Sequence, residues 1–452
     1  MSRHLKVLDA GGRAGRRRIE KLVARGREVL DPKTVRAARR IVERVREGGD
    51  RALLDHVRRL DGHQATAVAD LELARGADVP GPPTPEGLPE GFAEALERAI
   101  HAVERFHRPQ VRQGYRLEED GVVLEELRTP LARVGIYVPG GRAAYPSTVV
   151  MTAVPARLAG VRELVVATPP GSYRASPALR YALHRLRIDE VWGMGGAHAV
   201  AALAYGTETV RRVDKIVGPG NAWVTAAKSL VSADVGIDSL AGPSEVVIVA
   251  GGPHRGEEEG ALADRLAADL LAQAEHDPRA AAVLLTDDRR LARAAARRVE
   301  ARLAELVTAE AAAASLRSFG AALVVASMAE AAELVRRLAP EHLQLVGAGA
   351  EALAADGAEP LPAGAVFVGS STPEVFGDYV AGPSHVLPTC GTARFASALG
   401  VEDFIRRSHR LRVSPEAARA MAPAAIALAR VEGLPAHVAS ARLRLPAGRR
   451  GG

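Results

Sequence analysis

The chain has 452 residues, a formal net charge of +6 and 47% hydrophobic residues, a length that predicts two or more globular units rather than one core. The single cysteine, Cys390, excludes an intrachain disulfide framework and favours a reducing, cytoplasmic setting. The first residues form no apolar signal segment, and no later apolar run reaches the roughly 18 residues of a membrane span. We therefore predict neither a signal peptide nor a membrane association.

Most of the basic residues are arginines, and some of them cluster, as at residues 16–18 and 449–450. Such clusters can indicate a nucleic-acid partner. Here acidic residues are nearly as numerous, and no aromatic residues that could stack on bases are interleaved with the clusters. Solvated helix faces with ion pairs one turn apart explain the pattern better, so we expect no nucleic-acid binding.

The first 130 residues combine helical patterns with one hairpin signal. Val35, Val42 and Val45 form an apolar stripe with helical spacing, and a further helix is predicted over residues 92–106. The pair Asp120-Gly121, between two short runs of strand-forming residues, predicts a tight hairpin turn.

From residue 133 the chain alternates short apolar runs, glycine-rich turns and helical patterns. Predicted strands lie at residues 134–138, 164–167, 190–192 and 215–217, and glycine-rich turns lie at 139–141, 193–196 and 218–220. This alternation predicts βαβ units and a parallel sheet. Glycine turns let a phosphate approach a helix N-terminus, but Gly193, Gly195 and Gly196 form an incomplete dinucleotide fingerprint. A nucleotide site and a role in packing therefore both stay open.

A second alternating series begins with a predicted strand at residues 246–250. Leucines every four residues predict a helix that Pro278 ends, and a buried strand follows at residues 281–286. Gln273 and His276, three residues apart near the end of this helix, can direct two donor groups to one point. Their helix-to-strand turn lies at an edge of an α/β sheet, where loops build sites. On these residues alone, metal binding competes with capping and surface roles.

These patterns predict an α/β fold with two incomplete Rossmann-like domains side by side. The first α/β domain combines residues 31–136 with 246–399, and the second, on the nucleotide side, spans residues 137–245. Residues 1–30 form a helical N-terminal segment, and residues 400–452 form a strand-poor helical tail. Such a short tail cannot bury a sizeable core alone and must dock on something larger.

Several motifs, in collinear order over nearly the whole chain, resemble those of the histidinol dehydrogenase family. They are Tyr137-Val-Pro-Gly-Gly141, Val217-Gly-Pro-Gly-Asn221 with Lys228, Ala241-Gly-Pro-Ser-Glu245, Gln273-Ala-Glu-His276, Pro340-Glu-His-Leu343, Gly377-Asp-Tyr379, His385-Val-Leu-Pro-Thr389 and Glu432-Gly-Leu-Pro-Ala-His437. Motifs in order are far more specific than any one of them. The resemblance implies oxidation of L-histidinol to L-histidine through the aldehyde, with two NAD molecules reduced in turn on a zinc-containing homodimer.

The resemblance also implies roles for particular residues. One zinc ion per subunit would be held by Gln273, His276, Asp378 and His437. These nitrogen and oxygen donors suit zinc, although an amide oxygen is an unusual ligand. The substrate would contact the same four residues and Ser244, His342, His385 and Glu432, and NAD would contact Tyr137, His198 and Asn221. Without the resemblance, Asp378 is interpreted as a turn residue and His437 as a helix-surface residue.

Residue chemistry assigns the two catalytic roles to Glu341 and His342. Removing a hydride from an alcohol requires the hydroxyl proton to leave, and His342, with an ordinary pKa of about 6.5, can accept that proton. The second oxidation requires water to add to the aldehyde, and Glu341 is the candidate base for that water. Zinc would hold the substrate through its imidazole and amino nitrogens. Without the resemblance, both residues could equally be solvent-facing groups at a helix end.

Two residues depart from the family pattern. His198 stands where the family usually has glutamine, and Ser384 stands where asparagine commonly precedes the substrate-site histidine. The resemblance further implies that the C-terminal tail docks on the partner subunit, so that Glu432 and His437 complete the other subunit's site.

Other functions remain to be separated from this one. A related zinc- and NAD-dependent dehydrogenase could act on another polyol, such as a sulfopropanediol, although the motif ending in His437 favours histidinol. A zinc hydrolase could use Glu341 to activate water, but it would not need the strand, glycine turn and helix series that binds a cofactor. A non-catalytic relative is disfavoured because Glu341 and His342 are both present.

Overall fold

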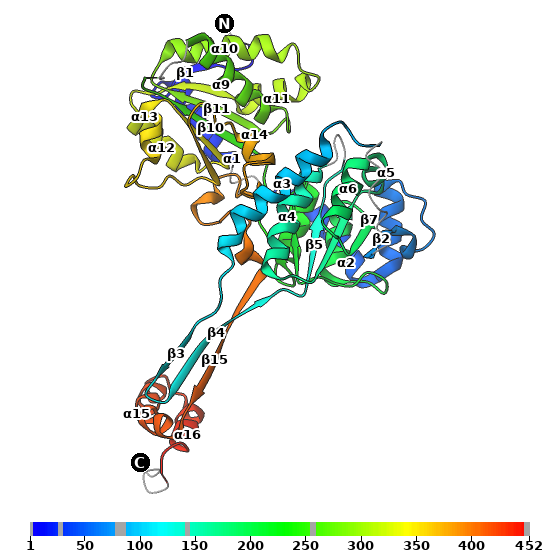
Figure 1. Cartoon of the computed structure of the whole chain (residues 1–452), viewed down its shortest axis with the longest axis vertical. Coiled ribbons are helices and arrows are strands. Elements are labelled where there is room, and N and C mark those ends of the chain that lie inside the picture. Colours follow the sequence, from blue (N-terminus) through cyan, green and yellow to red (C-terminus); the bar gives the residue numbers. More distant parts are fainter. Residues whose placement is uncertain (1–2, 26–29, 77–86, 141–144, 254–258, 447–452) are drawn as a thin grey trace. The chain divides into compact units, whose positions relative to one another are not determined.

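The computed structural model describes residues 3–25, 30–76, 87–140, 145–253 and 259–446. Contacts divide the chain into two units: Met1–Gln110 with Ala132–Phe404, and Val111–Leu131 with Ile405–Gly452. The first unit holds two six-stranded sheets, and the second holds a three-stranded sheet (Figure 1). Within the described residues, no helix combines the length and the apolarity that crossing a bilayer requires.

One sheet of the first unit is entirely parallel, with the order β1-β12-β11-β10-β13-β14. Its strands are β1 (Val7–Asp9), β10 (Glu245–Ala250), β11 (Ala281–Thr286), β12 (Ala321–Val324), β13 (His342–Val346) and β14 (Ala365–Val368). Helices α1 (Arg13–Arg25), α9 (Glu259–Ala274), α10 (Arg289–Leu303), α11 (Ala309–Phe319), α12 (Met328–Leu338), α13 (Ala348–Glu351) and α14 (Glu374–Tyr379) accompany it. We call this the catalytic sheet.

Helices cover both faces of the catalytic sheet, which explains why its central strands are apolar without polar alternation. Val246 and Ile248 of β10 pack in one core with α9, α10 and α11. Their neighbours Val247 and Val249 point the opposite way and pack in a second core with α1 and α12. The period of two along the strand divides these side chains between the two faces.

The other sheet of the first unit has the order β2-β7-β6-β5-β8-β9. Its strands are β2 (Glu72–Arg75), β5 (Arg133–Tyr137), β6 (Glu163–Thr168), β7 (Glu190–Gly193), β8 (Lys215–Val217) and β9 (Gly236–Ile237), and only β2 is antiparallel to its neighbour. Its helices are α2 (Pro32–His56), α3 (Phe92–His107), α4 (Pro146–Ala159), α5 (Pro170–Ala175), α6 (Pro177–Arg185), α7 (Gly196–Tyr205) and α8 (Ala222–Val231). We call this the cradle sheet.

The strand order of the cradle sheet reverses at β5. The chain runs from β5 through β6 to β7 on one side, and then crosses to β8 on the other side of β5. A crevice therefore opens outside the carboxyl ends of β5 and β8, which is where ligands bind in open parallel sheets. The glycine turns at residues 139–140 and 218–220 occupy this edge.

The second unit contains an antiparallel sheet of β3 (Arg116–Glu119), β4 (Val122–Pro130) and β15 (Ile405–Val413), in the order β15-β4-β3. Asp120 and Gly121 adopt positive φ values of 47° and 79°, which confirms the predicted hairpin turn. Helices α15 (Pro415–Val431) and α16 (Pro435–Arg442) follow β15 (Figure 1). They share a small apolar cluster.

The structure corrects the predicted domain boundaries at three places. Residues 1–30 are not only helical, because β1 pairs with β12 at the edge of the catalytic sheet. Residues 32–75 were assigned to the domain of residues 246–399, but α2 packs on α7 and α8, and β2 pairs with β7 of the cradle sheet. Residues 405–413 of the predicted helical tail form the strand β15. Each error concerns a long-range pairing that local periodicity does not encode.

Candidate active site

A cavity of about 740 Å³ in the first unit is lined by loops of both sheets. The lining includes Pro139, Gly140, Gly220, Asn221 and Trp223 beside the cradle sheet, and Ser244, Gln273, His276, Glu341, His342, Asp378 and His385 beside the catalytic sheet. The structure thus brings together most of the residues that the motifs singled out. Glu432 and His437 lie exposed in the second unit.

Glu341 and His342 stand at the amino end of β13, and one residue of the neighbouring strand holds both. The backbone N–H of Glu245 donates to Glu341 Oε2 at 3.0 Å, and the backbone oxygen of Glu245 lies 3.2 Å from His342 Nδ1. A carbonyl oxygen only accepts, so Nδ1 carries a hydrogen, and Nε2 is the nitrogen that can gain or lose a proton. His342 Nε2 is buried and makes no hydrogen bond within the described residues.

Three carboxyl groups surround the imidazole of His342. Oε2 of Glu341 lies 3.9 Å from Nδ1, Oε2 of Glu374 lies 3.8 Å from Nδ1, and Oδ1 of Asp378 lies 3.7 Å from Nε2. Glu374 was not predicted as a site residue, although it precedes Asp378 by one helical turn on α14. That spacing is the signal that could have identified it.

Burial and mutual charge shift the pKa values of these groups. Burial raises the pKa of Glu341 to about 7 and that of Glu374 to about 8, while the nearby His342 opposes both shifts. Burial would lower the pKa of His342, but the carboxylates of Glu341, Asp378 and Glu374 raise it to about 10. The expectation of an unperturbed His342 is therefore wrong for the unliganded site, because three acidic groups face one imidazole.

Gln273 lies in the last turn of α9 and His276 lies two residues beyond its end, beside this cluster. The Gln273 side chain is only 1% exposed, and its Oε1 makes no hydrogen bond within the described residues, whereas His276 is exposed. Such an unpartnered buried oxygen has the character of a metal ligand that lacks its ion. Among the described residues, however, no three His, Cys, Asp or Glu side chains form a metal-binding group.

Asp378 and His385 are joined through the backbone. The oxygen of Asp378 lies 2.9 Å from His385 Nδ1, which directs the other ring nitrogen of His385 away from that bond. Burial would raise the pKa of Asp378, but the neighbouring imidazoles of His342, His385 and His276 lower it. Ser384 donates from Oγ to the oxygen of Met151 on α4, so this departure from the family pattern anchors the loop that carries His385.

The cradle sheet contributes turns whose polar groups are already occupied by protein. The amide of Gly195 donates to Asp61 Oδ2 at 3.0 Å, and the amide of Gly196 donates to Tyr137 Oη at 3.0 Å. His198 Nε2 lies 2.9 Å from the same oxygen of Asp61, and the His198 side chain is 1% exposed. Tyr137 and His198 are thus buried behind the turn, and neither is among the residues that line the cavity.

A buried ion pair shapes the turn at residues 217–221. Lys228 Nζ donates to the oxygen of Gly218 at 2.5 Å and to Asp238 Oδ1 at 2.6 Å, while the Gly218 amide donates to Asp238 Oδ2 at 2.7 Å. Gly218 has a φ of 109°, and a Cβ atom there would lie 2.2 Å from the backbone oxygen of Tyr137. Only glycine fits this position. Asn221, at the end of the turn, caps α8 by accepting from the amides of Trp223 and Val224.

Sequence reasoning missed Asp61 and Asp238 as well as Glu374. Asp61 precedes Gly62 and Asp238 follows a short strand, so both have the local pattern of turn residues. Gly195, the partner of Asp61, lies 134 residues away, whereas Gly218 and Lys228, the partners of Asp238, lie 20 and 10 residues before it. No signal local to either residue predicts these contacts.

Two parallel sheets that enclose one cavity, with glycine turns on one side and a buried acid–base pair on the other, define an α/β enzyme of the dehydrogenase type. A family model described as histidinol dehydrogenase matches residues 25–445. The histidinol dehydrogenase of Caulobacter vibrioides is 46% identical over 415 residues, which cover 90% of this chain and 92% of the relative. That of Rhizobium meliloti is 45% identical over 422 residues, with 91% and 92% covered.

A solved structure gives the same result for the fold. The crystal structure of histidinol dehydrogenase from Elizabethkingia anophelis matches with a TM-score of 0.83 and 28% identity, and 98% of each chain is covered. The chain therefore belongs to the histidinol dehydrogenase family. It is an NAD-dependent oxidoreductase of histidine biosynthesis.

Proposed function

We propose that the 740 Å³ cavity oxidises L-histidinol through L-histidinal to L-histidine and reduces two NAD molecules in succession. The observation that supports this reaction best is the acid–base pair Glu341–His342, held by the backbone of Glu245 in a cavity that also reaches the turns at Gly140 and Gly220. The substrate named for the relatives agrees with this chemistry.

In the proposed first step the neutral form of His342, which its raised pKa of about 10 makes more abundant as the pH rises, accepts the hydroxyl proton of histidinol. Hydride passes to NAD at the same time, which leaves the aldehyde. In the second, Glu341 removes a proton from water as that water adds to the aldehyde carbon. Hydride from the resulting hydrate passes to the second NAD, and the carboxylic acid forms. The two bases approach within 3.9 Å of each other, so they can serve one carbon without moving the substrate far.

The donor set in this unit fits a zinc ion in part. Gln273 Oε1 is buried and unpartnered within the described residues, and Asp378 and His276 line the same cavity. We propose that these three residues and His437 of the partner subunit hold one zinc per subunit. When bound, the ion would act as a Lewis acid that fixes the substrate's nitrogens. Metal analysis of the purified protein, with Gln273→Ala as the comparison, tests this assignment independently of activity.

Two further proposals concern assembly and cofactor. Exposed apolar residues on α15, among them Met421, Leu428 and Val431, support a homodimer in which the second unit docks on the partner and supplies Glu432 and His437.

Asn221 lines the cavity beside the N-terminus of α8, where backbone amides favour an NAD phosphate. Tyr137 and His198 would act on NAD from behind the glycine turn, and the enzyme would work in the cytoplasm.

A single assay tests the proposed function and its alternatives. NADH formation is measured with L-histidinol and with a sulfopropanediol as substrates, before and after chelation. Histidinol-dependent NADH that is lost on chelation supports the proposal, whereas preference for the sulfopropanediol would assign the chain to another polyol dehydrogenase. Hydrolysis without any dependence on NAD would indicate a zinc hydrolase instead.

A further inference from the structure

Arg25, the last residue of α1, is buried against the loop that leads into β10. Its Nε and Nη2 donate to the oxygen of Arg279 at 3.1 and 2.9 Å, and Nη2 also donates to the oxygens of Pro243 and Ser244 at 2.5 and 3.0 Å. Nη1 donates to Glu245 Oε2 at 2.5 Å. The guanidinium thus ties Pro243, Ser244 and Glu245 to the turn before β11, and only 5% of Arg25 is exposed. We call these three residues the substrate loop because Ser244 lines the 740 Å³ cavity.

Glu245 connects Arg25 to the acid–base pair. Its carboxylate accepts from Arg25 on one oxygen and from the Cys390 amide, at 2.8 Å, on the other. Its backbone N–H and oxygen are the partners of Glu341 Oε2 and His342 Nδ1. A rotation of this one residue would therefore move the partners of both catalytic side chains together.

The fixed position of Glu245 depends on the charge of Arg25. A buried carboxylate that loses its cation must rotate toward water or take up a proton. Cys390 offers only a neutral backbone amide, which it directs at Glu245 from a left-handed conformation with a φ of 54°. Arg25 is the one side-chain cation that pairs with Glu245 among the described residues.

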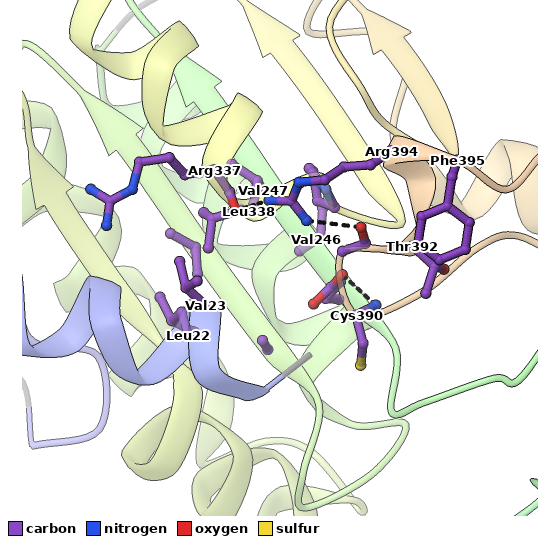
Figure 2. A pocket seen from close by; sticks show the side chains of 15 residues that line it. Leu22, Val23, Val246, Val247, Arg337, Leu338, Cys390, Thr392, Arg394 and Phe395 are labelled. Atoms are coloured by element: carbon purple, nitrogen blue, oxygen red, sulfur yellow. Dashed lines mark hydrogen bonds between the residues drawn. The ribbon is translucent and has the colours of Figure 1, made fainter. Parts of the chain in front are cut away.

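A second cavity, of about 360 Å³, lies against this contact and is lined in part by Glu245. Figure 2 shows Leu22 and Val23 of α1 on one side of it and Cys390 and Thr392 on the other, with Val246 of β10 between them. A small cation can therefore approach the Glu245 carboxylate if the Arg25 side chain is removed, which makes chemical rescue possible.

We propose that Arg25 is a positioning residue for the oxidation: through Glu245 it fixes the backbone groups that orient Glu341 and the Nδ1–H of His342. The inference rests on the proposed roles of Glu341 and His342. It goes beyond them by placing the control of both bases on a side chain that touches neither. A merely structural arginine would stabilise the fold without affecting the chemistry.

The test compares Arg25→Ala with Arg18→Ala. Arg18 lies on the same helix and also binds backbone oxygens, those of Arg317 and Ser318, but it has no contact with the substrate loop. We expect Arg25→Ala to lower kcat for histidinol by about 100-fold, as displacement of a catalytic group by roughly 1 Å does, with the KM for NAD within about twofold of wild type. Arg18→Ala should keep the wild-type kcat.

Rescue distinguishes positioning from stability. Millimolar ethylguanidinium should restore part of the kcat of Arg25→Ala and leave wild type and Arg18→Ala unchanged. The double variant Arg25→Ala with Glu245→Gln should have nearly the same kcat as Arg25→Ala alone, because both changes remove the same ion pair. A folded Arg25→Ala with wild-type kcat would overturn the proposal. Equal losses of kcat in the two arginine variants would overturn it as well.

A measurement that does not depend on enzyme activity tests the role of Arg25 separately from the proposed function. The ring ¹⁵N signals of His342, assigned by their loss in His342→Gln, should report hydrogen-bonded Nδ1–H in wild type and a shifted Nδ1–H signal in Arg25→Ala. If Arg25→Ala does not fold, Glu245→Gln replaces it in the same measurement. Wild-type protein that does not oxidise histidinol would refute the proposed function alone, whereas an unchanged His342 ring in a folded variant would refute the role of Arg25.

Discussion

The two sheets of the first unit meet the cavity with opposite edges. The cradle sheet uses the carboxyl ends of β5 and β8, where helices α4 and α8 begin. The catalytic sheet uses the amino ends of β10 and β13, and α9 ends there with Gln273. Helix N-termini favour anions and helix C-termini favour cations. This difference supports the proposed placement of the NAD diphosphate on one side of the cavity and of the proposed zinc and the amino alcohol on the other.

The two sides also differ in how their polar groups are satisfied. Around the cradle turn, the amides of Gly195 and Gly196 already have protein partners. Around the catalytic pair, Gln273 Oε1, His342 Nε2 and Glu374 Oε2 are buried without hydrogen bonds inside the described part of the chain. Unsatisfied buried groups are costly unless a ligand completes them. His198 Nδ1 beside the cradle turn is also buried without a hydrogen bond within the described residues, so the two sides differ in number, and the three such atoms at the catalytic pair support the chemistry proposed there.

Removing the acid–base groups should break the catalytic side most severely. We expect His342→Ala to lower the rate of histidinol oxidation by about 10³-fold, since it removes the proton acceptor of the first step. Glu341→Gln should mainly slow the conversion of supplied histidinal, because it loses the base for water. Rates of NADH formation with each substrate provide the measurement. A Glu341→Gln enzyme that oxidised histidinal at the wild-type rate would remove Glu341 from this role.

The proposed sharing of sites between subunits predicts a complementation result. Asp378→Ala in the first unit and His437→Ala in the second should each be inactive alone. After the two variants are unfolded, mixed and refolded, about half of the dimers should be mixed with one working site each, which gives about a quarter of wild-type activity. Inactive heterodimers, with wild type surviving the same treatment, would show that the second unit serves its own chain.

The cap of α8 offers a test confined to the cradle side. Asn221→Ala should raise the KM for NAD by about tenfold while kcat changes little, because the cap and a polar group of the cavity are lost together. Asp288→Ala is the matched control, since Asp288 caps α10 through the amides of Arg290 and Leu291. Both changes should cost about 1 kcal/mol of stability. If Asp288→Ala raised the KM for NAD as much as Asn221→Ala does, the effect would come from the lower stability of the fold and not from the NAD site.

A buried network on the cradle sheet should control stability rather than catalysis. Arg133 donates to both oxygens of Glu190, and Trp192 donates to one of them. Burial raises the pKa of Glu190, but these donors and the charge of Arg133 outweigh it and bring the pKa to about 2. Because the pKa is lower in the folded state, this stabilisation is present above the ordinary glutamate pKa and is lost as the pH falls toward 2.

Glu190→Gln should therefore reduce the free energy of unfolding at neutral pH by a few kcal/mol and flatten its decrease between about pH 5 and pH 2. Urea unfolding at several pH values gives the measurement, and NADH formation should be unchanged while the variant is folded. Glu416→Gln, which removes an exposed pair with Arg419, should change stability by less than about 0.5 kcal/mol. Equal pH profiles for Glu190→Gln and wild type would contradict the assignment.

The sequence by itself determined the local elements and the site motifs. Apolar runs, glycine turns and helical stripes predicted the alternation of strands and helices, and Asp120-Gly121 predicted the hairpin, because periodicity and turn chemistry act over a few residues. The collinear motifs predicted which residues would meet, and eight of them line one cavity.

Only the tertiary structure decided which strand joins which sheet and which distant residues complete the site. The pairing of β2 with β7, the insertion of β1 beside β12, and the contact of Arg25 with Glu245 span from about a hundred to more than three hundred residues. Asp61 and Arg25 each have the local pattern of an ordinary polar residue, and Glu374 differs from that pattern only in lying one helical turn before Asp378. Their partners become neighbours only when the cores close, and burial of charge then makes the contacts strong.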